Sequence, residues 1–174
     1  MHHDEVDIFE EFISNTLFDD INIDSKKGSM FAKKVLDYII KNTTLEINVE
    51  FKISPFFNES FNVDNYLEYF LDFSQSRLFY SSFNSDFIYA VKRKYPKLET
   101  GLLFESSFNS MKINWNLVDN LHPHWTVINK NLVEKTHKKG KKIVTYPVDS
   151  IRIFNKLKEM GVDAVITNDP ASLI

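Results

Sequence analysis

Charged and hydroxyl side chains capable of chemistry lie at the ends of several predicted strands. Glu50 and Lys52 alternate with apolar residues and place a carboxylate and an ammonium group on one face of a strand. The same alternation is also typical of a solvent-exposed strand face. Ser81 and Ser82 have no His–Asp pair placed to activate them, which favours packing and hydrogen bonding over a nucleophilic role.

A basic run covers 137–142, with the sequence HKKGKK. Such a run either binds phosphate or is the solvated end of a helix, where the helix dipole favours cations. The helix-end interpretation is favoured because a glycine interrupts the run where a helix is expected to stop.

Composition narrows the class of protein. The chain has 174 residues, 43% of them hydrophobic, which is enough for one domain with a core. A net charge of −3 argues against nucleic-acid binding, and the absence of cysteine excludes disulfides and thiol nucleophiles. No apolar run approaches the ~18 residues needed to span a bilayer, and the first residues are acidic. We therefore expect a cytoplasmic protein without a transmembrane segment.

Helices and strands alternate along the chain. Helices are predicted over 29–41, 62–73, 86–95, 130–139 and 151–160, and strands over 43–52, 77–83, 98–104, 141–148 and 162–167, with a short strand near 120–121. The acidic stretch 5–24 predicts a short helix or an arm. The last strand, helix and strand form a βαβ crossover, which implies a parallel sheet. The chain is therefore predicted to be doubly wound or a (β/α) barrel.

Five short motifs, in order along the chain, resemble those of the glycerophosphodiester phosphodiesterase family. The clearest is the C-terminal GVDAVITNDP (161–170), preceded by a strand ending in YPV. The others are HHDE (2–5), INVEFK (47–52), SSFN (81–84) and TGLLF (100–104). Each motif alone is short, but all five occur in the same order as in the family, and together they extend the resemblance over residues 2–170.

The resemblance implies a TIM-type (β/α) barrel with its site at the carboxyl ends of the strands. It implies metal-dependent hydrolysis of glycerophosphodiesters to glycerol 3-phosphate and an alcohol, with calcium or magnesium as cofactor. On the matching positions, His3 is the general acid or base, Glu50 a metal ligand and Lys52 a phosphate neighbour. Tyr146 stands where the family has tryptophan and is expected to provide an aromatic wall for the glycerol group.

The same resemblance gives the histidines on either side of Pro123 a possible place at the pocket rim. These are His122 and His124, which follow a stretch of the chain whose pattern is the least clear.

Several family motifs do not occur in the chain. The resemblance leads us to expect His-Arg-Gly, Glu-Asn-Thr and Glu-x-Asp before the His-Asp motif, and none is present. We therefore expect an incomplete barrel without the first two of its eight strands, with weak binding of the cation. Exposed strand edges favour self-association or pairing with the missing N-terminal segment.

Two units and two functions are expected on this basis. Residues 1–28 form an N-terminal arm with the His-Asp motif, and residues 29–174 form the partial barrel. The first function is phosphodiester hydrolysis of a small glycerophosphodiester. The alternative is a non-catalytic remnant, or a fragment that needs a partner chain, and a small-molecule-binding domain of unrelated chemistry is a third interpretation.

Overall fold

The computed structural model describes residues 26–44, 46–53, 62–68, 70–73, 78–106 and 112–173. The chain divides into two compact units. One comprises Met1–Glu46 with Tyr66–Arg77, and the other comprises Ile47–Asn65 with Leu78–Ile174. The predicted division into an arm over 1–28 and a barrel over 29–174 stays a prediction, because residues 1–25 lie outside the described part.

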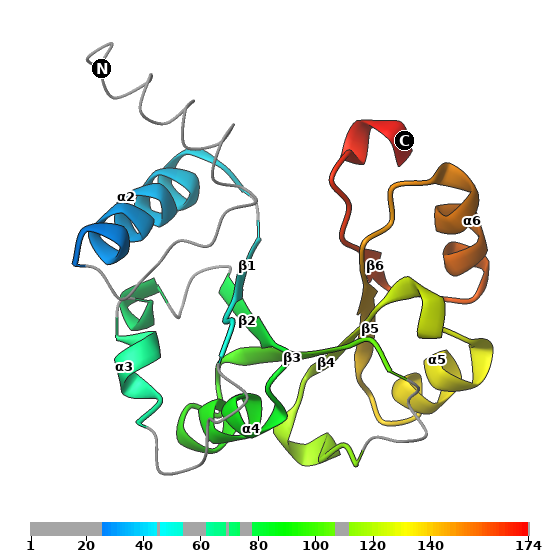
Figure 1. The fold of residues 1–174 in the computed structure, drawn as a ribbon, viewed down its shortest axis with the longest axis horizontal. Helices are drawn as coiled ribbons and strands as arrows, with labels where there is room; N and C mark the ends of the chain where they lie inside the picture. Colours follow the sequence, from blue (N-terminus) through cyan, green and yellow to red (C-terminus); the bar gives the residue numbers. More distant parts are fainter. Residues whose placement is uncertain are drawn as a thin grey trace. The chain divides into compact units, whose positions relative to one another are not determined.

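The second unit is built on a six-stranded sheet whose strands are neighbours in chain order. The strands are β1 (Ile47–Glu50), β2 (Leu78–Ser82), β3 (Glu99–Phe104), β4 (Asn120–Pro123), β5 (Lys142–Thr145) and β6 (Ala164–Val165). All five pairings are parallel, and the sheet curves as part of a barrel wall (Figure 1). The predicted fold class, an incomplete (β/α) barrel, is confirmed.

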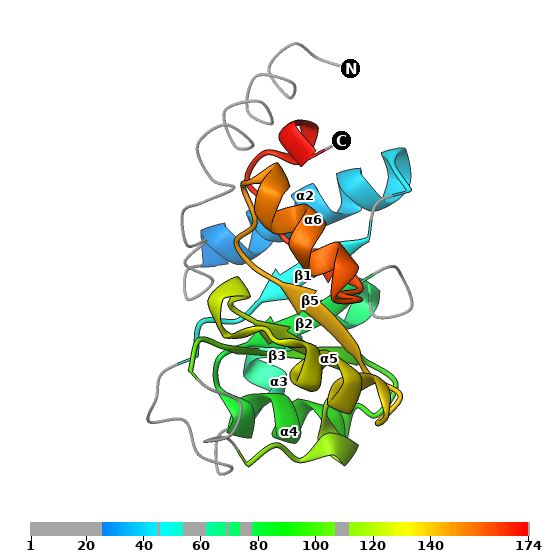
Figure 2. The ribbon, with the colours of Figure 1, turned by 90° about the vertical axis from the view of Figure 1, so that its right-hand side faces the viewer.

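Helices of this unit cover one face of the sheet. They are α4 (Ser85–Lys94), α5 (Lys130–His137) and α6 (Ile151–Glu159). The same unit contains three short 3-10 helices, namely η3 (Trp115–Leu117) before β4, η4 (Trp125–Val127) after β4 and η5 (Pro170–Leu173) after β6. Figure 2, viewed from the side of α5 and α6, shows both helices in front of β5. The first unit contains α2 (Lys26–Asn42) and η1 (Leu71–Phe73), while α3 (Asp64–Leu67) crosses the division between the units.

Local sequence signals account for the ends of the helices. Asn84 and Asn129 cap α4 and α5, each accepting a hydrogen bond from a backbone N–H three residues on. Gly140 and Gly161 follow α5 and α6 with φ of 68° and 86°, a left-handed conformation that glycine adopts without strain. The expected start of the helix at residue 130 and the expected ends of the helices before Gly140 and Gly161 are confirmed.

Ring contacts identify the two faces of the sheet. Phe51 and Tyr80 pack with their centroids 6.1 Å apart, and Phe51 lies 5.2 Å from Phe87 of α4. These side chains therefore point to the helix-covered face. Because side chains alternate along a strand, Asn48, Glu50 and the odd-numbered residues of β2 point to the opposite face, which we call the inner face.

Two aspartates hold the amino ends of β3 and β5 in place through hydrogen bonds. Asp119, just before β4, accepts hydrogen bonds from the backbone N–H of Thr100 at 2.9 Å and from Lys92 Nζ at 2.6 Å. It thereby joins β3 to α4. Asp163 repeats the arrangement one βαβ unit later, accepting from the N–H of Ile143 at 2.8 Å and lying 2.9 Å from His137 Nε2.

We expect Asp119→Asn to lower the free energy of unfolding by about 1–2 kcal/mol, because the neutral amide replaces a charge-assisted hydrogen bond with the Lys92 ammonium group by a weaker neutral one. The Lys92 side chain is only 14% exposed, so water does not replace the lost partner fully. Thermal unfolding followed by circular dichroism measures the change.

The matched control is Asp72→Asn, which breaks an ion pair with Lys33 whose side chains are 45% and 71% exposed. Water screens such a pair, so this variant should melt within error of the wild type. Equal midpoints for Asp119→Asn and the wild type would show that the Asp119 contact is energetically neutral.

Four elements differ clearly from their expected form. The predicted helix over 62–73 is two short pieces, α3 and η1. The predicted strands 43–52, 141–148 and 162–167 are shorter than expected and cover only Ile47–Glu50, Lys142–Thr145 and Ala164–Val165. The stretch 5–24 lies outside the described residues. Within the part of the chain that is described, no helix has the length and hydropathy to cross a membrane.

Candidate functional site

Five side chains gather at the carboxyl ends of β1 to β5, and we call them the strand-end cluster. Each is the last residue of its strand or the residue that follows it, and each has the alternation of the inner face. The members are Glu50, Phe83, Glu105, His124 and Tyr146. The carboxyl ends of parallel strands meet at one edge of the sheet, which is where sites lie in barrels of this type.

Tyr146 is the centre of the cluster. Its ring packs edge to face against Phe83, with centroids 6.0 Å apart and planes at 90°. On another side it meets His124 at 5.7 Å and 86°. The backbone bridge between His124 and Tyr146 and the 2.9 Å hydrogen bond from Trp125 N to Tyr146 O extend the β4–β5 pairing to this point.

Two carboxylates act on the Tyr146 hydroxyl. Burial and the negative charges of Glu105 and Glu50 all raise the pKa of Tyr146 well above its ordinary value. Burial is the largest of the three causes. The tyrosine therefore stays a neutral hydroxyl at physiological pH, and the two carboxylates lie close enough to influence it.

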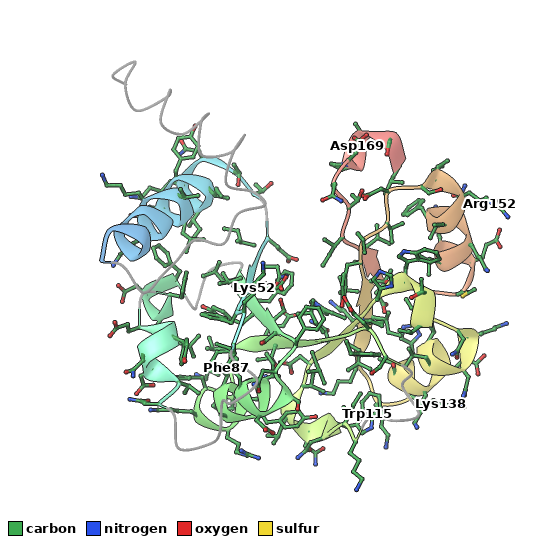
Figure 3. The ribbon with its side chains drawn as sticks, viewed as in Figure 1. Lys52, Phe87, Trp115, Lys138, Arg152 and Asp169 are labelled. Atoms are coloured by element: carbon green, nitrogen blue, oxygen red, sulfur yellow. The ribbon has the colours of Figure 1, made fainter. Side chains whose placement is uncertain are left out.

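The end of β1 carries the predicted metal ligand and phosphate neighbour. Glu50 closes β1 and is exposed, and Lys52 follows two residues later on the same side of the chain, also exposed. Figure 3 draws Lys52 beside β1, on the side of the sheet away from α4. Asn48 precedes them on the inner face and accepts a 2.9 Å hydrogen bond from Ser81 Oγ, which fixes the register of β1 against β2.

The histidines have different environments. His124 is half-buried in the strand-end cluster, and its Nδ1 lies 2.7 Å from Thr126 Oγ1. His122 is fully buried one layer below, with its ring 6.1 Å from Phe79. A rim position for His122 is therefore wrong, since two residues separate inner-face side chains by one layer of the sheet. His3, the predicted acid or base, lies outside the described residues.

His122 is an unpaired polar ring among the described residues. Neither of its nitrogens has a hydrogen-bond partner, and burial lowers its pKa to about 4. The ring lies directly over Gly101 on the neighbouring strand. It fills space as a neutral group, which suits a structural role and not a catalytic one.

The loops after β5 and β6 are tied together by Asp149. Its carboxylate accepts hydrogen bonds from the backbone N–H and the side-chain amide of Asn168, both at 2.8 Å, and from Thr167 Oγ1 at 2.9 Å. These bonds from Asn168 and Thr167 hold the pKa of Asp149 below its ordinary value. Ser150 occupies the N-cap position of α6 without a side-chain cap bond, since the carboxylate of Asp149 is used by the next loop.

The described residues supply only some of the ligands that a divalent cation needs. Calcium takes about six to eight oxygen ligands, and magnesium keeps several waters around one or two carboxylates. Over the described ranges, no three His, Asp or Glu side chains gather in a way that could hold a metal ion. Glu50 and Glu105 supply carboxylates at the strand ends, but these residues alone do not complete a site.

Sequence reasoning missed two members of the cluster, Phe83 and Glu105. Phe83 was considered only as part of a family motif, and Glu105 fell in a stretch without clear periodicity. A usable signal was present: each residue follows directly on an apolar strand, at the position where the alternation points to the inner face. Phe83 is 48% exposed, unusual for a large apolar side chain beside a sheet.

The sequence matches a known protein family over most of its length. The sequence pattern of the "Glycerophosphoryl diester phosphodiesterase family" matches residues 13–172. A glycerophosphodiester phosphodiesterase of Caldanaerobacter subterraneus subsp. tengcongensis is 32% identical over 105 residues, which is 58% of this chain and 42% of that protein. The predicted family resemblance is therefore confirmed.

Solved structures show the same fold. A glycerophosphodiester phosphodiesterase from Parabacteroides distasonis has a TM-score of 0.62 at 23% identity, over 84% of this chain and 60% of that one. An Oleispira antarctica phosphodiesterase, solved with the product sn-glycerol-3-phosphate, has a TM-score of 0.63 at 19% identity, over 78% and 56%.

The chain thus spans between 42% and 60% of the length of these three relatives. Its six parallel strands correspond to part of their barrels. With a family pattern that extends from residue 13 to residue 172 and a matching half-barrel, this chain belongs to the glycerophosphoryl diester phosphodiesterase family.

Proposed function

We propose that the chain takes part in the metal-dependent hydrolysis of glycerophosphodiesters to glycerol 3-phosphate and an alcohol. Family membership supports this reaction class, and the product named for the Oleispira antarctica relative is glycerol 3-phosphate. The observation that carries the proposal is the strand-end cluster, in which Glu50 and Tyr146 both lie at the edge of the sheet that holds the site in barrel enzymes.

Each proposed residue has a role that follows from its chemistry. Glu50 is proposed as one carboxylate ligand of calcium or magnesium, because a hard cation prefers anionic oxygen. Lys52 adds positive charge near the phosphate, where hydrolysis concentrates negative charge on the oxygens. The Tyr146 ring forms a wall for the carbon chain of glycerol. His3 is proposed as the general acid or base, and as the acid it donates a proton to the departing alkoxide.

A second candidate function rests on the incompleteness of the site. The chain spans 56% of the Oleispira antarctica structure, and the described residues alone gather no group of three metal-binding side chains. Among the described residues, β1 and β6 each have one neighbouring strand in the sheet. In this alternative, the half-barrel is a non-catalytic remnant, or it becomes active only when another chain or segment pairs with these edges and supplies further carboxylates.

We expect Glu50→Ala to abolish metal-dependent release of glycerol 3-phosphate, with a fall of roughly 100-fold or more, as for other lost electrostatic groups. The assay uses the full chain with glycerophosphocholine and glycerophosphoethanolamine, with calcium, with magnesium and with a chelator. Glycerol 3-phosphate is measured by a coupled enzymatic reaction.

The control is Glu134→Ala, which removes an exposed carboxylate from α5, one of the helices that cover the face of the sheet opposite to the inner face. It should retain wild-type turnover. Turnover that survives Glu50→Ala would contradict the role of Glu50. A folded wild-type chain without turnover would favour the second candidate function, in which a partner completes the site.

A further inference from the structure

A lysine-rich segment connects the end of α5 to the start of β5, at the amino end of the sheet. Residues 135–142, with the sequence KTHKKGKK, carry five lysines and no acidic residue, and we call this segment the lysine turn. The whole chain has a net charge of −3, so the residues outside the lysine turn carry −8 between them. Positive charge is therefore concentrated at one place on a chain that is otherwise acidic.

The backbone of the lysine turn is fixed by its own hydrogen bonds. The four backbone N–H groups of residues 138–141 all donate to carbonyls of residues 134–137, at 2.8–3.2 Å. Gly140 closes the turn with a φ of 68°. A discrete anion site built from the backbone needs N–H groups that converge on the anion. Since the N–H groups of this turn are already used, its lysine side chains are what it offers to an anion.

These lysine side chains face solvent. Lys138, at the end of α5 (Figure 3), is exposed, as are Lys139 and Lys142, and Lys141 is half-buried. A Cβ built on Gly140 would meet no atom within 4 Å, so the tip of the turn borders open space. Over the described part of the chain, none of these four lysines forms an ion pair.

The helix dipole accounts for only part of this charge. Cations are favoured within the last turn of a helix, which here holds Lys135 and His137. The four lysines of 138–142 follow that turn, and two of them lie beyond the glycine. The acidic residue bonded to this segment, Asp163, pairs with His137 and not with these lysines. Like charges gathered in this way repel one another, and an anionic partner would relieve the repulsion.

A surface that bears many anions suits the lysine turn best. A lysine ammonium group is a compact point charge on a flexible stem, whereas planar recognition of a single phosphate favours arginine. The lysine turn has no arginine, and no phenylalanine, tyrosine or tryptophan on which a nucleic-acid base could stack. Clusters of about four to eight basic residues are typical of segments that bind acidic phospholipids, and each lysine strengthens that binding about fivefold.

We propose that the lysine turn binds the surface of a bilayer that contains acidic phospholipids. This inference does not rest on the proposed function. Lys142 begins β5 and Tyr146 follows its end, four residues or about 13 Å along the strand. This separation exceeds the Debye length of about 8 Å at physiological ionic strength, so the carboxylates of the strand-end cluster are largely screened from the lipid. A chain bound in this way keeps the strand-end cluster at the end of β5 opposite to the lipid.

Co-sedimentation of the full chain with lipid vesicles measures the binding. One set of vesicles contains phosphatidylcholine alone, and the other contains phosphatidylcholine and phosphatidylserine. We expect binding only to the acidic vesicles in about 0.15 M salt. The binding should be lost in about 1 M salt, where the Debye length falls to about 3 Å.

Substitutions locate the contact. The double variant Lys138→Gln with Lys139→Gln should bind acidic vesicles at least tenfold more weakly, because two lysines are lost. Arginine at both positions keeps the charge and should preserve the binding. The matched control is Lys34→Gln with Lys41→Gln, which removes two exposed lysines from α2 and changes the net charge equally. It should bind as the wild type does, and circular dichroism checks that each variant is folded.

The inference is overturned if the folded wild-type chain binds neither kind of vesicle, or binds both equally. It is also overturned if the α2 control loses as much binding as the lysine-turn variant, because net charge alone would then be responsible. Displacement from vesicles by inorganic phosphate, at an ionic strength where sodium chloride has no effect, would indicate a discrete anion site instead. Tighter binding to single-stranded RNA than to acidic vesicles, at equal phosphate concentration, would make the partner a nucleic acid and contradict the proposal.

Discussion

Replacing Gly101 with alanine should lower the free energy of unfolding by about 2–3 kcal/mol, as expected for an overpacked core. A Cβ at this position would lie 2.5 Å from His122 Nε2 and 2.6 Å from His122 Cε1. The ring has no exposed surface and cannot swing aside into solvent. Alanine gains about 0.5–1 kcal/mol over glycine in a strand, which is smaller than the expected strain. Urea denaturation measures the difference.

The control for this prediction is a double-mutant cycle with His122→Ala. Removing the ring creates the space that the alanine methyl group needs, so Gly101→Ala should destabilise far less in the His122→Ala background. We expect a coupling energy of about 1–2 kcal/mol between the two positions. Additive effects would contradict the packing of His122 against Gly101 as the cause.

Acidification from pH 6.5 to pH 4 should lower the free energy of unfolding by about 3 kcal/mol through His122 alone. Burial lowers the pKa of His122 to about 4, whereas the unfolded chain has the ordinary value of 6.5. Between these values the unfolded state binds a proton that the folded state does not, so stability falls as the pH falls, by about 1.4 kcal/mol per unit. Above pH 6.5 both states are neutral and the effect vanishes.

Comparison with His122→Leu isolates this contribution, because the other titrating groups are common to both proteins. Leucine is apolar and of similar size, and it carries no proton between pH 4 and pH 7. The wild type should therefore lose about 2–3 kcal/mol more than the variant between pH 7 and pH 4.5 in urea denaturation. Parallel losses would mean that His122 is protonated in the folded state at pH 4.5.

Much of the fold could be predicted because the hydrophobic pattern of each segment matches the face that the segment buries in the sheet. The period-two pattern of 47–52 and the strand–helix–strand pattern at the C-terminus each place their apolar side chains on one face. Because that face must be buried, each pattern indicates both where a strand lies and which of its side chains point into the core. β4 was recognised only near 120–121, because Asn120 and His122 are buried polar residues and break the apolar pattern. Asn120 is accommodated by a 2.6 Å hydrogen bond from its side chain to Glu99, which no local pattern reveals.

The site was predicted less completely than the fold. Glu50 and Tyr146 were found because each lies in a family motif. Phe83 and Glu105 join them through the parallel register of β1 to β5, and register between distant segments cannot be read from spacing along the chain. His122 illustrates the opposite error, since its residue type suggested chemistry while its layer in the sheet excludes it from the strand ends.

The consecutive order of the six strands has a consequence for how the half-barrel is synthesised. Each strand from β2 onward pairs with the strand made just before it, so every partner is already present when a new strand leaves the ribosome. The closure of long loops, which slows the folding of many sheet proteins, is therefore small at each step. The sheet can grow one βα unit at a time during translation, and each added unit covers the edge left by the previous one.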